Sequence, residues 1–245
     1  MKNLKNRLLI NIYYFLFWIV YFVFARFFFL MYYIDKTQEL AFSTTIKTFL
    51  YGLRLDVSFA AYLSIIPFLL IIFSIFMYPK VILKTIKWYT IILIIFVSLL
   101  LFIDAGLYQA WGVRLDTSLL PYLNTPELMI SSTSTFQLVS GIVGWLCISF
   151  VFIKLYKTIH KKNSEKINVG SWLQIPIFLL ITAVLIIPVR GGLQTIPVNQ
   201  SNVYFSDKMF ANHAAINFIW NFFNTLTHKT DGTNPYISFD NETAL

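Results

Sequence analysis

Five long apolar stretches constrain the fold more than any other feature of the sequence. A membrane-spanning helix needs about 20 mostly apolar residues. The five stretches run from Leu8 to Leu30, Val57 to Tyr78, Trp88 to Tyr108, Phe136 to Tyr156 and Ser171 to Val189. Only 12% of the residues are charged, against roughly 25% in soluble domains. The sequence therefore predicts an all-α membrane protein with five transmembrane helices.

The distribution of basic residues predicts the orientation of these helices. Eleven lysines and arginines, with Glu165 as the single acid, lie before the first stretch, between the second and third, and between the fourth and fifth. Basic residues concentrate on the cytoplasmic side of a membrane. We therefore expect the N-terminus in the cytoplasm and the C-terminus outside. On this topology, residues 1–189 form the transmembrane domain, 190–230 an outer interfacial segment, and 231–245 a polar linker.

The outer segments carry patterns of their own. Apolar residues at helical spacing between Phe42 and Leu53 predict a short surface helix before the second span. Asn124-Thr125-Pro126-Glu127 is typical of a helix start. In the tail, Ser206-Asp207 could begin a helix that runs to about Thr227 and lies on the outer membrane surface. Its polar stripe would consist of His213, Asn217, Asn221, Asn224 and His228.

A repeated motif lies on the predicted outer side. The pattern G-x-R-L-D-x-S-x-x-x-Y-L begins at Gly52 and again at Gly112, 60 residues later. Arginine presents several donors that suit a phosphate or carboxylate, so the two copies could bind a phospholipid headgroup. Each aspartate could orient the arginine of its own copy or of the other copy. The candidate headgroup residues are Arg54, Asp56, Tyr62, Trp111, Arg114, Asp116 and Tyr122. The alternative is that two Arg–Asp pairs only fix loops at the membrane surface.

Two further charges fall inside the predicted spans. Arg26 lies in the outer third of the first span, and Asp104 lies in the outer part of the third. A lone charge in a membrane costs about 2.5–3.5 kcal/mol on insertion scales, so the two could pair at similar depth. Alternatively, Arg26 extends to the outer headgroups.

Several functional classes find no support in the sequence. The net charge of +8 sits in short clusters between apolar runs, so we expect no nucleic-acid partner. The three histidines are scattered and the acids do not accompany them at metal-ligand spacing, while Cys147 is the only cysteine. We therefore expect no metal, no cofactor and no catalytic residue in this chain.

The order of these motifs resembles the membrane region of lipoteichoic acid synthase-like proteins of the alkaline phosphatase and sulfatase superfamily. The most specific segment begins with Arg190-Gly191-Gly192-Leu193-Gln194, continues through Pro197-Val198-Asn199-Gln200-Ser201 and ends with Asn212-His213-Ala214-Ala215-Ile216-Asn217. The Gly-Gly-Leu-Gln version is similar to a branch found in Bacteroidetes-type bacteria. The resemblance adds Arg190, Asn199, Asn212 and Asn217 as candidate outer-face residues.

The resemblance implies a multi-pass protein of the bacterial cytoplasmic (inner) membrane, followed by an extracellular catalytic domain with Mn or Zn. That domain transfers phosphoglycerol or phosphoethanolamine from an anionic or zwitterionic phospholipid. The chain stops at Leu245, where the domain would begin, so we expect the membrane part of a longer enzyme that uses its own C-terminal domain as partner. The alternatives are the anchor of a sulfatase-type hydrolase and a non-enzymatic binding or transport module.

Overall fold

A computed structural model describes residues 2–124, 134–164 and 167–227 of the chain. The described residues form helices and connecting loops, with no strand among them. Five helical segments are long and apolar enough to cross a membrane: Asn3–Tyr32, Phe42–Phe73, Pro79–Trp111, Thr135–Ser164 and Trp172–Val189. The predicted all-α fold with five candidate spans is confirmed.

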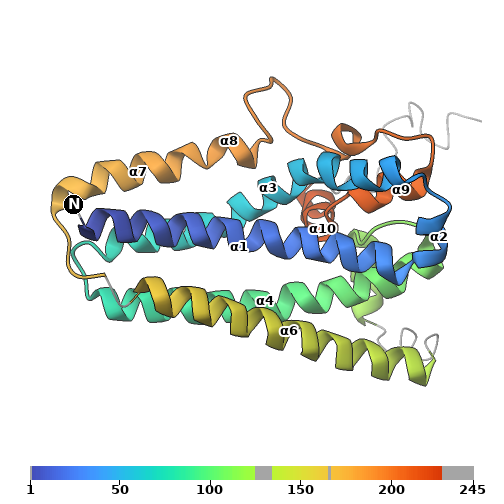
Figure 1. Cartoon of the computed structure of the whole chain (residues 1–245), viewed down its shortest axis with the longest axis horizontal. Coiled ribbons are helices and arrows are strands. Elements are labelled where there is room, and N and C mark those ends of the chain that lie inside the picture. The colour runs from blue at the N-terminus through green and yellow to red at the C-terminus, as the bar shows by residue number, and fades with distance from the viewer. Residues whose placement is uncertain (1, 125–133, 165–166, 228–245) are drawn as a thin grey trace, which may run out of the picture.

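The spans run up and down along one axis and give the bundle two distinct ends (Figure 1). The lysine end contains the start of α1 (Lys2–Tyr32) and the connection between α3 (Phe42–Phe73) and α4 (Pro79–Trp111). It also contains the connection from α6 (Thr135–Ser164) to α7 (Ile175–Val184), through the short η2 (Trp172–Gln174). The opposite end, which we name the tail end, contains α2 (Ile34–Gln38), η1 (Thr117–Asn124) and α9 (Met209–Ala215), whereas the loop that follows α8 (Ile186–Val189) lies about midway along the bundle.

The helices α1, α3 and α4 form the interior of the bundle. Large aromatic side chains of α1, including Trp18, Tyr21 and Phe22, are fully buried because α1 packs against both α3 and α6. α3 also contacts α4, α7 and α8. By contrast, most residues of α6 and α7 face outward, which suits helices that contact lipid on their apolar sides.

Arg7 is a structural residue at the lysine end, although the sequence suggested only a topology signal. Its side chain is fully buried. The guanidinium donates hydrogen bonds to the hydroxyl of Ser74 at 3.1 Å and to the carbonyls of Ser74 and Asn168 at 2.8 and 2.7 Å. Arg7 therefore joins the first helix to two interhelical connections.

The apolar pattern that begins at Phe42 does not form a separate surface helix. It continues without interruption into the second span as one helix of 32 residues, α3. No proline separates the amphipathic segment from the apolar run, Gly52 alone does not stop a helix, and the Asp56 carboxylate is bound by Arg26 and does not cap a new helix. The predicted helix start at 124–127 lies mostly outside the described residues.

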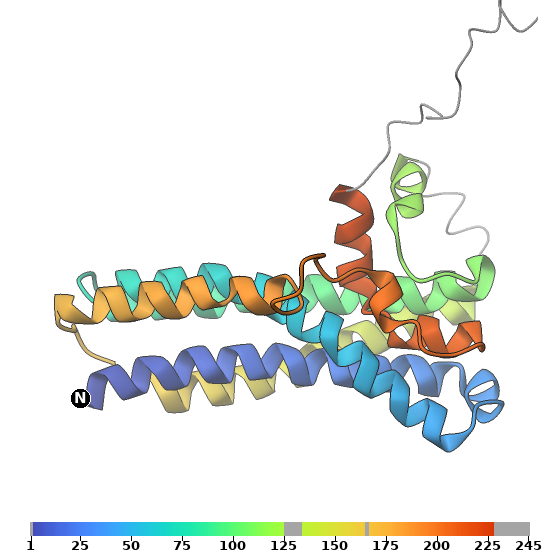
Figure 2. The ribbon, with the colours of Figure 1, turned by 90° about the horizontal axis from the view of Figure 1, so that it is seen from above.

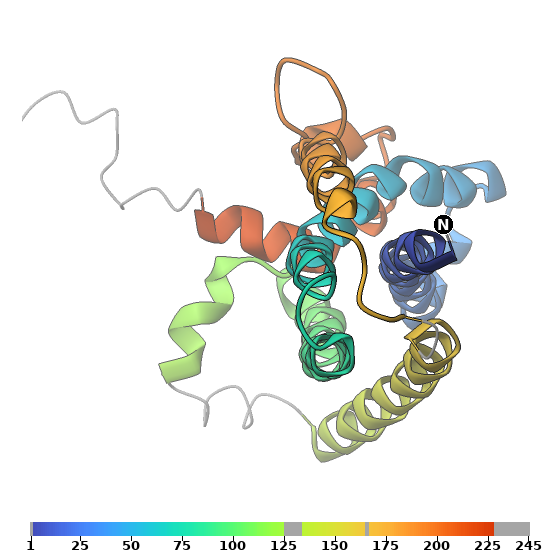
Figure 3. The same cartoon turned by 90° about the vertical axis from the view of Figure 1, so that its left-hand side faces the viewer.

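The tail forms two helices rather than the single helix expected. η3 (Gln200–Val203) precedes α9 (Met209–Ala215) and α10 (Phe218–Thr227). The break occurs because the Asn217 side chain accepts a hydrogen bond from the backbone N–H of Trp220 at 3.0 Å, which is the geometry of a helix N-cap. α10 runs across the long axis of the bundle (Figures 2 and 3).

The polar stripe expected to face water turns inward instead. His213, Asn217 and Asn221 are buried because α9 packs on α1 and α3, and α10 packs on α3, α4 and η1. His228 and the predicted linker 231–245 lie outside the described residues.

Candidate functional site

A buried ion pair joins the first two spans near the tail end. Arg26 of α1 and Asp56 of α3 are 3% and 0% exposed. Arg26 Nη1 donates to Asp56 Oδ2 at 2.8 Å, and Nη2 donates to Oδ1 at 2.9 Å. Two parallel bonds of this kind are the strong, directional form of an arginine–carboxylate contact. The pair therefore fixes α1 against α3.

A second buried ion pair closes the end of α4. Arg114, which follows that helix, contacts Asp104 within it at 2.8 Å, and both side chains are almost fully buried. Asp104 also accepts the backbone N–H of Leu115 at 2.7 Å. The guanidinium of Arg114 lies 3.9 Å from the centre of the Phe29 ring on α1, which adds a cation–π contact.

Both arginines hold the same end of α9. Arg26 donates to the carbonyl oxygens of Ala214 and Ala215 at 3.0 and 3.1 Å. Arg114 donates to the carbonyl of His213 at 3.1 Å. The last carbonyls of a helix have no partner within the helix, and cations are favourable there. The two ion pairs therefore clamp the C-terminal end of α9 to the bundle. We name Arg26, Asp56, Asp104 and Arg114 the clamp.

Two asparagines of the tail complete the clamp. The Asn217 amide donates to Asp56 Oδ1 at 2.9 Å. The Asn221 amide donates to the carbonyl of Leu115 at 3.0 Å, and its oxygen accepts a hydrogen bond from Gln200. Asn217 thus connects the first ion pair to the start of α10. Asn221 connects the backbone next to Arg114 to η3.

The pairing differs from the sequence-based predictions. Arg26 does not pair with Asp104, and neither aspartate of the repeat pairs with an arginine of the repeat. The partners are exchanged because α3 packs directly along α1, which brings Asp56 to Arg26. The chain then turns back after Gly112, which has a left-handed φ of 68°, and this turn returns Arg114 to Asp104.

The two copies of the repeat have different surroundings. In the first copy Asp56 is buried and Arg54 is exposed, whereas in the second copy Arg114 is buried and Asp116 is half-buried. Asp116 accepts the backbone N–H of Ser118 at 2.8 Å. Because Arg114 is occupied by protein groups, Arg54 is the motif arginine that is open to a lipid headgroup. The headgroup role of Arg54 stays a prediction.

The aromatic members of the repeat lie apart from the clamp. Trp111 and Tyr122 contact each other, with ring centres 5.5 Å apart. Tyr62 is 48% exposed and belongs to the wall of a separate cavity. The structure thus brings two of the seven predicted motif residues, Asp56 and Arg114, into the clamp and leaves the other five outside it.

An aromatic layer covers the clamp on the side of α2. His213 Nδ1 lies 3.0 Å from the hydroxyl of Tyr108, and the Tyr33 hydroxyl donates to the carbonyl of Ala105. Burial lowers the pKa of His213, and the charges of Arg114 and Lys36 lower it further. His213 is therefore neutral at pH 7, so the region carries no additional positive charge.

The remaining three outer-face candidates form hydrogen bonds in the segment between α8 and α9. Arg190 donates to the carbonyl of Thr195 at 3.0 Å and holds the loop that follows α8. Asn199 begins η3 with a reciprocal capping box to Asn202. The Asn212 side chain accepts the backbone N–H groups of Phe205 and Ser206 at 2.9 and 3.0 Å. These bonds fix local turns in the segment between α8 and α9.

The four clamp side chains are buried, and their two positive charges are balanced by two negative charges. We therefore assign the clamp a structural role. In the part of the chain that the structure describes, no group of His, Cys, Asp or Glu could hold a metal ion. The fold defines a multi-pass helical membrane protein whose tail is bound into the bundle. No family model, no curated protein and no solved structure matches the chain.

Proposed function

We propose that the bundle is the membrane domain of a lipoteichoic acid synthase-like transferase, and that it holds the catalytic domain at a fixed position on the outer membrane face. One observation carries this proposal: Arg26 of α1 and Arg114 after α4 both donate to the end of α9, and their ion pairs join these contacts to α3 and α4. A plain tether would need no such attachment. A tail fixed in this way fixes the starting point of whatever follows α10.

The resemblance found in the sequence supports the same proposal. Its most specific segment, residues 190–217, coincides with the packed path from α8 to α9 and the start of α10. The lysine-rich end lies at the opposite end of the bundle from α9, and the positive-inside rule supports an extracytoplasmic tail. In this proposal the tail end faces outward, toward the leaflet that holds the phospholipid donor.

The test uses the full-length protein in membranes that contain phosphatidylglycerol. We expect transfer of phosphoglycerol, and we expect Asp56→Asn to reduce that transfer because the catalytic domain loses its fixed position. Cleavage of a water-soluble phosphodiester by the same variant should stay unchanged. The matched control is Asp35→Asn, an exposed acid on α2, which should affect neither reaction.

Two outcomes would overturn the proposal. Cleavage of sulfate esters without lipid-dependent transfer would identify a sulfatase-type hydrolase on a membrane anchor. A coding region that contains no catalytic domain after this segment would favour a non-enzymatic module.

A further inference from the structure

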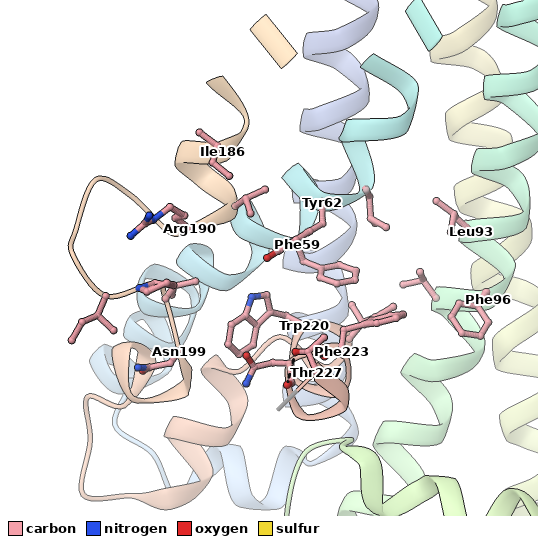
Figure 4. Close-up of a pocket in the computed structure, with 18 residues that line it drawn as sticks. Phe59, Tyr62, Leu93, Phe96, Ile186, Arg190, Asn199, Trp220, Phe223 and Thr227 are labelled. Atoms are coloured by element: carbon pink, nitrogen blue, oxygen red, sulfur yellow. Dashed lines mark hydrogen bonds between the residues drawn. The ribbon is translucent and has the colours of Figure 1, made fainter. Parts of the chain in front are cut away.

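A large apolar cavity lies beside the clamp, between α3, α4, α8 and α10. Its volume is about 930 Å³, which is at the upper end of the roughly 300–1,000 Å³ found for small-molecule pockets. Figure 4 shows side chains from these helices around one space. The walls include Phe59, Tyr62, Leu93, Phe96, Ile186 and Trp220. The cavity is therefore built by elements that are far apart in the sequence.

The cavity opens sideways from the bundle. Tyr62, Phe96 and Ile186 are 48%, 43% and 58% exposed. All three belong to candidate spans, so in a bilayer these walls contact the hydrocarbon region or its edge. An apolar chain can enter from the membrane without crossing water.

Polar groups mark one side of the same cavity. Trp220 is only 5% exposed, and its indole N–H is a hydrogen-bond donor in the cavity wall. Figure 4 shows this nitrogen directed toward the Tyr62 side of the cavity. An indole N–H at this position can donate to an acceptor atom of a bound molecule.

A cation stands at the rim, where the fifth span ends. Arg190 is the first residue after the span Trp172–Val189, and it lines the cavity. Its Nη2 donates to the carbonyls of Gln194 and Thr195 at 3.4 and 3.0 Å, and the residue is exposed. Among the described residues, the lining contains no acidic side chain. The cavity thus passes from apolar walls to hydrogen-bond donors and a positive charge.

We infer that this cavity binds an anionic phospholipid, with an acyl chain along α3 and α4 and the phosphate near Arg190. The apolar walls fit the chain, and Trp220 and Tyr62 can donate to ester or phosphate oxygens. A zwitterionic lipid carries a positive group as well, which the cation at the rim disfavours. The site requires no enzymatic activity, so it stands or fails separately from the proposed transferase.

The test measures lipid binding to the delipidated chain in detergent by native mass spectrometry. The probes are palmitoyl-oleoyl phosphatidylglycerol and the phosphatidylcholine with the same chains. We expect phosphatidylglycerol to remain bound in preference to phosphatidylcholine. Arg190→Gln should weaken phosphatidylglycerol binding roughly tenfold through loss of a charge-assisted hydrogen bond. Lys47→Gln, which removes an exposed cation outside the cavity, should leave binding unchanged.

A filling variant tests the acyl-chain half of the site. Ile186→Trp places a large side chain at a residue that is 58% exposed, so it fills the cavity entrance without crowding the core. It should reduce the binding of both lipids while the unfolding temperature without lipid stays the same. Equal affinity for the two lipids, or binding that neither Arg190→Gln nor Ile186→Trp reduces, would overturn the inference.

Discussion

The Asp56→Ala variant is expected to lose about 3–5 kcal/mol of folding free energy, the usual cost of removing one partner from a buried ion pair. Asp56 is completely buried, and it accepts two hydrogen bonds from Arg26 and one from Asn217. Without the carboxylate, the Arg26 guanidinium remains buried with only the α9 carbonyls as partners. Chemical denaturation in detergent micelles measures the loss.

The repeat provides the matched control. Asp116→Ala makes the same change at the same motif position of the second copy. Asp116 is half-buried and accepts only the local N–H of Ser118 among the described contacts, so the variant should lose at most about 1 kcal/mol. A double variant, Arg26→Met with Asp56→Ala, should lose less than the sum of its two single variants, because no buried charge remains unpaired. Equal losses for Asp56→Ala and Asp116→Ala would contradict the role of the clamp.

The Gly52→Ala variant should displace α9 from the bundle. A Cβ atom at Gly52 would collide with the Arg26 guanidinium and would come within 2.5 Å of the carbonyl oxygen of Ala215. The second of these is backbone and cannot move without moving α9. Overpacking of this kind costs about 1–3 kcal/mol. Thermal unfolding should show the loss, and cleavage by a protease within the tail should become faster.

Gly106→Ala on α4 is the control for glycine in a helix. Apart from the adjacent backbone of its own helix, no described atom lies within 4 Å of a Cβ built at Gly106. Alanine is favoured over glycine inside a helix by up to about 1 kcal/mol, so this variant should be equally stable or more stable. If Gly52→Ala behaves like Gly106→Ala, α9 does not pack against α3 as closely as the structure indicates.

Much of the fold could be predicted from the sequence because membrane spans have a strong local signal. Length and hydropathy identify the five spans without knowledge of their neighbours. Gly191 and Gly192, with φ values of 80° and 135°, mark the exit from the fifth span for equally local reasons. Helix boundaries were less accurate, since the amphipathic segment from Phe42 merges into α3.

The clamp could be predicted only in part, because its pairs depend on helix packing. The sequence indicated all four charges, but the pairing of Arg26 with Asp56 follows from the side-by-side packing of α1 and α3. The inward direction of Asn217 and Asn221 follows from the break before α10, since a continuous helix would have placed them differently. The sequence cannot indicate that the carbonyls of α9 bind the two arginines, because every residue has a backbone carbonyl.

The repeat shows how one sequence pattern can serve two structural purposes. Gly52 is needed because α9 passes close to α3, whereas Gly112 is needed because the chain leaves α4 with a positive φ. Likewise, the first copy contributes its aspartate to the clamp and the second contributes its arginine. The likeness of the two copies therefore does not by itself indicate two equivalent headgroup sites.

The attachment of α9 to the bundle is tested most directly by amide hydrogen exchange over Met209–Ala215. In the wild-type protein these amides should exchange slowly, like those of the buried spans. In the double variant Asp56→Asn with Asp104→Asn, exchange in this segment should be roughly tenfold faster or more, since each tenfold reflects about 1.4 kcal/mol of local opening free energy. Peptides from the middle of α6 should not change. Equal exchange of Met209–Ala215 in both proteins would contradict the account.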